Sequence, residues 1–135
     1  MALGDSLRTH AEIYDNLSEE ARKSADNDQA AALTTQKGLD TPWREELING
    51  LGSATDNNSR RVVVEDIWKK CSKKLSEIDS KSYDMDAAAF NYNEYVKLSK
   101  SERLLKNLLS SLKDIEVYEA VRDGLREVAA SLDHI

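Results

Sequence analysis

The sequence has little of what interrupts regular secondary structure. Its 135 residues include one proline and five glycines, which favours long helices over a sheet protein, because a sheet needs frequent turns. The single cysteine, Cys71, excludes an intrachain disulfide and favours a reducing compartment. No apolar run approaches the about 18 residues that span a membrane, and the first residues lack the basic and apolar segments of a secretory signal. We therefore expect a cytoplasmic protein that does not enter a membrane.

Residues that carry catalysis are equally scarce. Only His10 and His134 offer an imidazole base, and the charged surroundings of His10 indicate a solvated side chain rather than one activated by neighbours. Zinc and di-iron sites are not indicated, because the chain has no cysteine pair, no His-Glu-x-x-His motif and no Glu-x-x-His motif. The segment Gly50-Leu51-Gly52 lacks the third glycine of a dinucleotide fingerprint. We expect no cofactor, no small-molecule ligand and no enzyme activity.

Length and charge are those of one acidic domain. A chain of 135 residues can bury one core without a metal or disulfide, so we expect a single helical domain over residues 1–135. The net charge of -6 is spread unevenly: -6 over residues 1–58, +4 over residues 59–113 and -4 over residues 114–135. Mutual neutralisation of neighbouring helices explains this order. The alternative is a basic surface reserved for an acidic partner.

Two helices are predicted in the first half of the chain. Apolar residues recur at helical spacing from Ser6 to about Gly38, and glycine suits the position just past a helix end. This stretch is one long helix or two short ones, since Ser18 followed by acidic residues resembles a fresh helix start. Thr41 can cap the second helix, and Pro42 fits its first position.

The second helix is expected to end at Gly50 and Gly52. A polar loop follows over residues 53–58. Loops of this composition are typical sites of hinges and of protease cleavage. We therefore predict a possible hinge at 53–58 within the single domain.

The third helix carries the first of two heptad-like seams. Its apolar residues step by four and three, as in a coiled coil. This spacing places Cys71 inward, as a packed and inert side chain. A strand start at the β-branched residues 62–64 is the alternative, but the helical period continues well beyond them. The seam consists of Val64, Trp68, Cys71, Leu75 and Ile78.

The last third of the chain carries the second seam. A helix is expected from Asp86, with a possible restart or kink at residues 99–102, which have the form of a capping box. Leucines then form a face broad enough to be buried. Gly124 costs helix stability and could allow another helix to approach closely. The candidate helix-contact residues are Leu105, Leu108 and Leu112 of this face, and Tyr118, Val121, Leu125, Val128 and Leu132 of the seam.

A basic cluster on the third helix supplies the alternative function. Several phosphates could be neutralised there, with salt-sensitive affinity. Acidic residues on the same helix and the acidic chain as a whole argue for a solvated or internally paired surface instead, because nucleic-acid domains are usually basic. The candidate residues are Arg60, Arg61, Lys69, Lys70, Lys73, Lys74 and Lys81.

These patterns predict an all-α bundle of four to six mostly antiparallel helices. The function they favour is a non-catalytic protein–protein interaction or assembly subunit that binds a protein partner or self-associates as an oligomer. A nucleic-acid-associated accessory protein, using residues 60–81, is the alternative.

Overall fold

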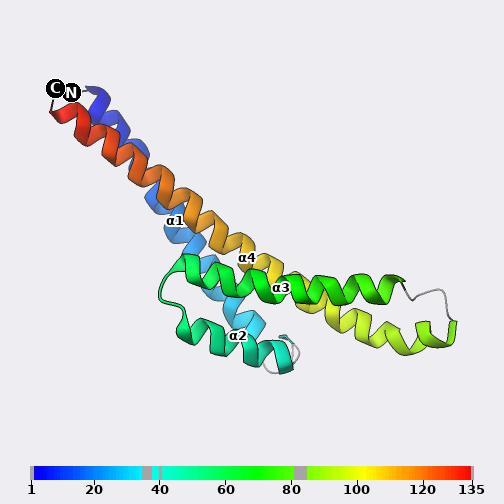
Figure 1. The fold of residues 1–135 in the computed structure, drawn as a ribbon. Coiled ribbons are helices and arrows are strands. Elements are labelled where there is room, and N and C mark those ends of the chain that lie inside the picture. The colour runs from blue at the N-terminus through cyan, green and yellow to red at the C-terminus, as the bar shows by residue number, and fades with distance from the viewer. Residues whose placement is uncertain (1, 35–37, 40, 81–84, 135) are drawn as a thin grey trace.

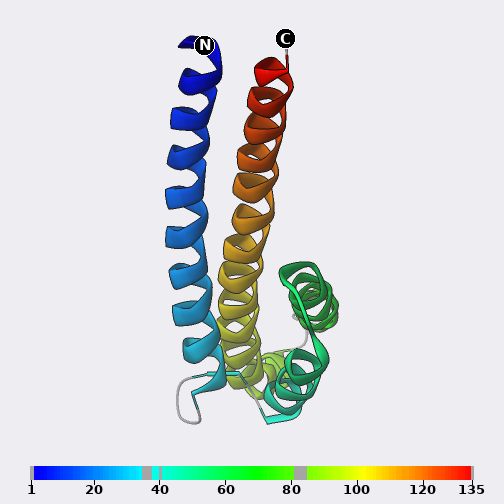
Figure 2. The same cartoon turned by 90° about the vertical axis from the view of Figure 1, so that its left-hand side faces the viewer.

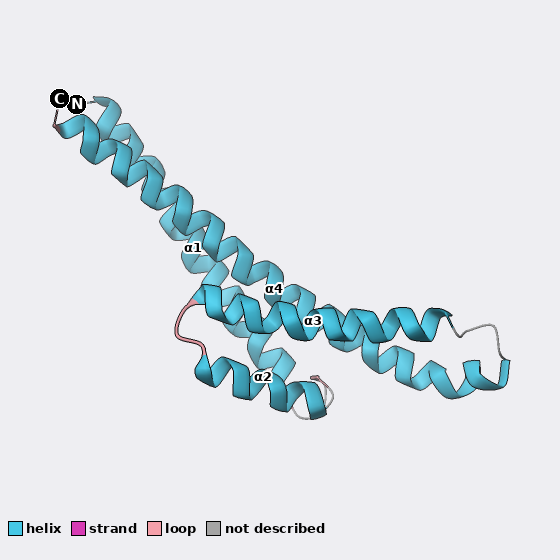
Figure 3. Ribbon diagram, in the orientation of Figure 1, coloured by secondary structure: helices cyan, strands magenta, loops and turns pink. Residues whose placement is uncertain are grey.

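All regular secondary structure in the described part of the chain is helical. The computed structural model describes residues 2–34, 38–39, 41–80 and 85–134, and no strand occurs among them (Figure 3). This confirms the all-α prediction with four helices. They are α1 (Ala2–Leu33), α2 (Thr41–Ser53), α3 (Asn57–Ser80) and α4 (Met85–Asp133).

The two longest helices, α1 and α4, run antiparallel along the length of α1, and the first part of α4 extends beyond α1 beside α3 (Figure 1). The first and last described residues therefore lie together at one tip (Figures 1 and 2). Helix α3 packs against α4 near the other end, and α2 packs against α3. We call α2 and α3, with residues 23–33 and 92–116 of the long helices, the body. Residues 2–22 and 117–133 form the arm, where α1 and α4 pack only on each other among the described helices.

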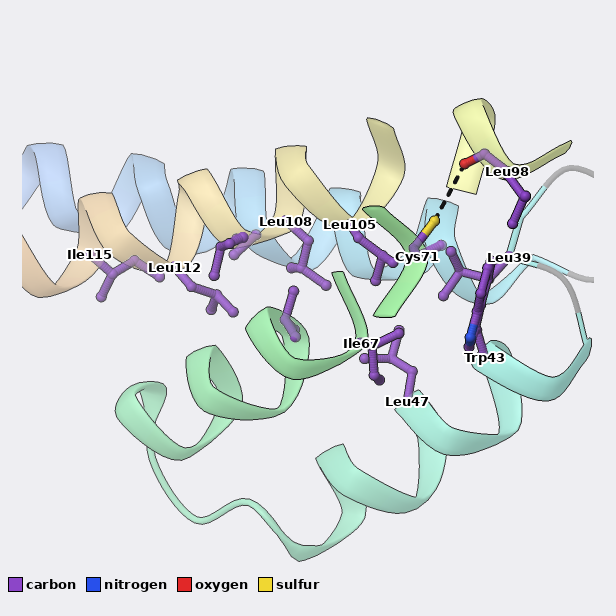
Figure 4. Packing of buried hydrophobic residues seen from close by; sticks show 14 of the residues in the cluster. Leu39, Trp43, Leu47, Ile67, Cys71, Leu98, Leu105, Leu108, Leu112 and Ile115 are labelled. Atoms are coloured by element: carbon purple, nitrogen blue, oxygen red, sulfur yellow. Dashed lines mark hydrogen bonds between the residues drawn. The ribbon is translucent and has the colours of Figure 1, made fainter. Parts of the chain in front are cut away.

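The core fills the body. Leucines of α4 meet apolar side chains of α3 and α2, and the Cys71 thiol donates a 3.4 Å hydrogen bond to the carbonyl oxygen of Leu98 (Figure 4). Burying one leucine or isoleucine side chain stabilises a fold by about 1.5–3 kcal/mol. The fully buried side chains include Leu47, Val64, Ile67, Cys71, Leu105, Leu108, Leu112 and Ile115.

Tertiary packing removes the helix breaks that local residue types suggested. Helix α1 is continuous through Ser18, which is buried and donates to the carbonyl oxygen of Asp15 at 2.8 Å. Helix α4 is likewise continuous through Ser101, which is 1% exposed. The Ser18 hydroxyl thus bonds back to its own helix instead of capping a new one.

Gly50 and Gly38 lie where the chain packs closely and not at helix ends. α2 begins at Thr41 as predicted but continues past Gly50 to Ser53. A Cβ on Gly50 would lie 2.4 Å from Cγ1 of Val63, so glycine lets α2 pack tightly on α3. α1 ends at Leu33, ahead of Gly38, where a Cβ would lie 2.4 Å from the carbonyl oxygen of Ala32.

The predicted loop at 53–58 is shorter than expected and is capped. Only residues 54–56 lie outside the helices. The backbone N–H of Ser59 donates to Oδ1 of Asp56 at 2.7 Å, which is an N-terminal cap for α3. This hydrogen bond lowers the pKa of Asp56 below its ordinary value.

Candidate interaction surface

Small residues line the side of α1 that faces α4. Five buried positions follow each other at intervals of seven, and each holds glycine, alanine or serine. Interaxial distance depends on the side chains at the contact, so these residues let the two helices approach closely. The sequence pattern of large apolar residues missed this heptad, although small residues recurring every seven positions could have revealed it. The five are Gly4, Ala11, Ser18, Ala25 and Ala32.

Ion pairs close one side of the arm. Arg8, Asp15 and Arg22 lie seven residues apart on α1 and pair with opposite charges on α4. Arg8 binds Asp133, and the Arg122 guanidinium donates to Asp15 at 2.7 Å. The hydrogen bond from Arg122 holds the pKa of Asp15 below its ordinary value. The alternation of charge along α1 matches one antiparallel register with α4.

On the opposite side of the arm, a stripe of side chains on α1 contacts a stripe of side chains on α4. The rings of Tyr14 and Tyr118 lie 6.3 Å apart, centroid to centroid. Nearer the body, the hydroxyls of Ser24 and Ser111 are 3.1 Å apart, and Ser111 also donates to Asp28 at 2.8 Å. Ser111 lies seven residues before Tyr118, so both contacts lie on one stripe of α4. The serine pair marks where this side becomes polar.

Asp114, seven residues before Val121, is the last charged residue on this side of α4; from there to the tip the side is mostly apolar. Leu3 is 62% exposed and Val128 is 52% exposed, whereas small residues fill the contact between the helices. Packing of α1 on α4 therefore covers these large apolar side chains only in part: Tyr14, Tyr118 and Leu125 are half-buried, and Val128 stays exposed. We call this surface the apolar face: Leu3, Leu7, Tyr14 and Leu17 of α1, and Tyr118, Val121, Leu125, Val128 and Leu132 of α4.

The apolar face contains no carboxylate, lysine or arginine at any of these positions. His10, on the same stripe of α1 by helical spacing, is its one titratable group besides the tyrosines. Its Nδ1–H donates to the carbonyl oxygen of Ser6 at 2.8 Å. In a chain in which 33% of residues are charged, an uncharged surface of this length is unusual.

The structure divides the predicted helix-contact residues into two groups. Leu105, Leu108 and Leu112 are 0% exposed in the body. The seam from Tyr118 to Leu132 lies on the apolar face, where Val121 is 37% exposed. The buried residues of α4 that face α1 near the seam are instead Ile115 and Ala129.

Gly124 has open space around it. No described atom lies within 4 Å of a Cβ built there, apart from its own helix and chain neighbours. The close approach that this glycine suggested is therefore not made within the described chain.

The arginines of the basic cluster form hydrogen bonds with residues of other helices in the chain. Arg61 donates to Glu116 at 2.9 Å, and this contact raises the pKa of Arg61. Arg60 donates to Gln29 at 2.7 Å. These hydrogen bonds therefore join α3 to α4 and to α1 where the arm begins.

Lysines of the same cluster are also partly engaged. Lys70 pairs with Glu46 of α2, which raises the pKa of Lys70, and Lys69 pairs with Glu65. Lys74 lies over the Trp43 ring at 5.5 Å. Lys73 is exposed. Lys81 lies outside the described residues. Internal pairing of this kind weakens the argument for an acidic partner.

The described residues bring together no set that points to catalysis. Cys71 is buried, as its place in the seam predicted. No three potential metal ligands gather in the described ranges. Two shallow hollows, of about 300 and 220 Å³, lie between α1 and α4 and between α3 and α4. The first is lined by Arg8, Glu12, Arg126 and Ala130, a mixture of charges without a nucleophile.

Comparisons of the chain with protein-family models, curated protein sequences and solved structures give no match. None of the described helices combines the length and the apolarity that crossing a membrane requires.

Proposed function

We propose that this chain is a non-catalytic helical interaction or assembly protein of the cytoplasm, which docks through the apolar face of its arm. The observation that carries the proposal is the uncharged face itself, with Val128 half exposed on a helix whose contact with α1 needs only small residues. Contiguous apolar surface rimmed by charge marks protein-contact sites on soluble proteins.

The two helices of the arm suit helix-in-groove recognition. Side chains at Tyr118, Val121, Leu125 and Val128 repeat at steps of three and four, which is the spacing that a partner helix reads. A third helix or a second hairpin can pack on one side of two antiparallel helices, as in a four-helix bundle.

Photo-cross-linking tests the proposal directly. A photoreactive amino acid at Val128 should form covalent adducts with protein when the chain is irradiated in the cells that produce it. The same group at Ala130, exposed two residues later on the other side of α4, is the matched control. Adducts at neither position, or equally at both, would contradict docking through the apolar face.

A further inference from the structure

The occupant of the apolar face can be argued from its charge and its area. Every ion pair that joins α1 to α4 in the arm lies on the other side, so the face offers no charge that would select an oppositely charged partner. The chain carries a net charge of -6, so two copies repel each other wherever acidic surfaces meet. This face is where two copies can meet without placing like charges opposite one another.

The area of the apolar face is large enough for a specific contact between the arms of two copies. Residues 2–22 of α1 span about 31 Å at a rise of 1.5 Å per residue, and two helices side by side are about 20 Å across. The footprint is then about 600 Å² per copy, or about 1,200 Å² for two copies, which is the lower end of specific, stable interfaces. Two hairpins meeting face to face also produce a four-helix bundle, the arrangement that buries such faces on both sides.

We propose that the apolar face binds the apolar face of a second copy of this chain, so that two arms form an intermolecular four-helix bundle. This inference rests on the proposed function, because it names the partner of the same surface.

The polar end of the face selects the antiparallel arrangement. Ser24, Ser111 and Asp28 form a hydrogen-bonded cluster where the arm joins the body. If the arms ran in the same direction, the two Asp28 carboxylates would be brought toward each other. With the arms antiparallel, each cluster lies beside the partner's tip, and the two bodies extend from opposite ends.

Sedimentation equilibrium of the purified chain is the decisive measurement. We expect a species of twice the 15.2 kDa chain mass, dissociating at concentrations on the order of micromolar because the interface is small. The double variant Val121→Glu, Val128→Glu should remain helical and sediment as a monomer at every concentration, since both side chains are exposed in the single chain.

The matched control places the same two charges on the other side of α4. Ala120→Glu with Ala130→Glu changes two exposed positions and should leave the dimer intact. A wild-type chain that is still monomeric at about 100 μM, well above the expected dissociation constant, would overturn the inference. A dimer that persists after the two valine substitutions would overturn it as well. If the monomeric chain still cross-links to a different protein from Val128 in cells, the proposed function stands and only the second copy is wrong. If it cross-links to nothing, both fail.

Spin labels test the direction of the arms. A label at Ser131, exposed near the tip, lies six residues beyond Leu125, the midpoint of the α4 stripe. In an antiparallel pair centred there, the two labels should be offset by about 18 Å along the arm. Labels separated by only the width of one helix, about 10–12 Å, would show parallel arms and overturn the antiparallel arrangement.

Discussion

The body and the arm use the same two helices in different ways. In the body, Leu105, Leu108 and Leu112 of α4 are fully buried under α3 and beside α1. In the arm, the buried positions of α1 are Gly4, Ala11, Ser18 and Ala21, and charged side chains join the helices along one edge. Leucine burial contributes far more free energy per residue than alanine burial, so the body holds most of the stability. In the arm, small residues let the two helices approach closely and ion pairs align them, whereas Leu3 and Val128 stay exposed.

The largest expected effect lies in the body. Leu108→Asp should unfold the chain, because an unpaired buried carboxylate costs several kcal/mol, comparable with the stability of a whole domain. Glu19→Ala, at an exposed position of α1, should melt close to the wild-type temperature. Thermal unfolding followed by circular dichroism compares the two. A Leu108 variant with the wild-type melting temperature would contradict the location of the core.

A substitution in the arm should have an intermediate effect that stays local. Ala11→Leu adds volume where α1 and α4 approach closely, at a cost of about 1–3 kcal/mol. Amides of the arm should then exchange hydrogen faster, while those near Leu108 keep their protection. Ala30→Leu, exposed on the same helix, is the control and should change neither region. Equal loss of protection in body and arm would show that they unfold as one unit.

Alanine substitutions at two glycines should change the stability of the chain in opposite directions. Gly124→Ala should stabilise the chain by about 1 kcal/mol, because alanine favours helix and its Cβ has open space. Gly50→Ala should destabilise it, because the new Cβ would press on the β-branched side chain of Val63, which has little rotamer freedom. The denaturant midpoint of each variant, compared with that of the wild-type chain, shows whether the substitution stabilises or destabilises the fold. A stabilised Gly50 variant would mean that α2 does not pack tightly on α3.

Acid should weaken the arm through Asp15. Arg122 holds the pKa of this carboxyl below its ordinary value of 3.8, so the unfolded chain takes up a proton at higher pH than the folded chain does. The stabilisation is present well above pH 3.8 and is lost as the pH falls through that value to the folded pKa. Asp15→Asn should therefore lose less stability than wild type on acidification.

Melting temperatures of both proteins at neutral and acid pH provide the test, with Glu19→Gln as the control variant. An unchanged acid dependence in Asp15→Asn would show that this ion pair contributes nothing to the arm.

The sequence pattern predicted the body better than the arm. Large apolar residues such as Val64, Cys71 and Leu108 repeat with the helix period and are buried, because the hydrophobic effect selects residues by apolar area. Gly4 and Ala11 carry little apolar area, so their heptad gives a weak hydrophobic signal although it determines how closely α1 and α4 approach.

The seam near the end of α4 shows a second limit. Tyr118, Leu125 and Val128 have a clean period, but periodicity gives a helix face and does not say what covers it. What lies on each side of α4 depends on long-range contacts such as Arg22–Glu119, whose members are 97 residues apart. Pairing of this kind is not visible in a local pattern. In the folded arm Ala129 is buried, whereas its neighbour Val128 is exposed.

The meeting of both ends at the tip has a consequence for how the chain folds. Sequence separation between paired residues grows outward along the molecule: 34 for Trp68–Glu102, 55 for Arg61–Glu116, 97 for Arg22–Glu119 and 125 for Arg8–Asp133. Closing the longest loop first would cost the most chain entropy, whereas after the body has formed each outward contact orders only a few more residues. Folding should thus proceed as a zipper from body to tip, and the tip, which closes last, should be the first part to open.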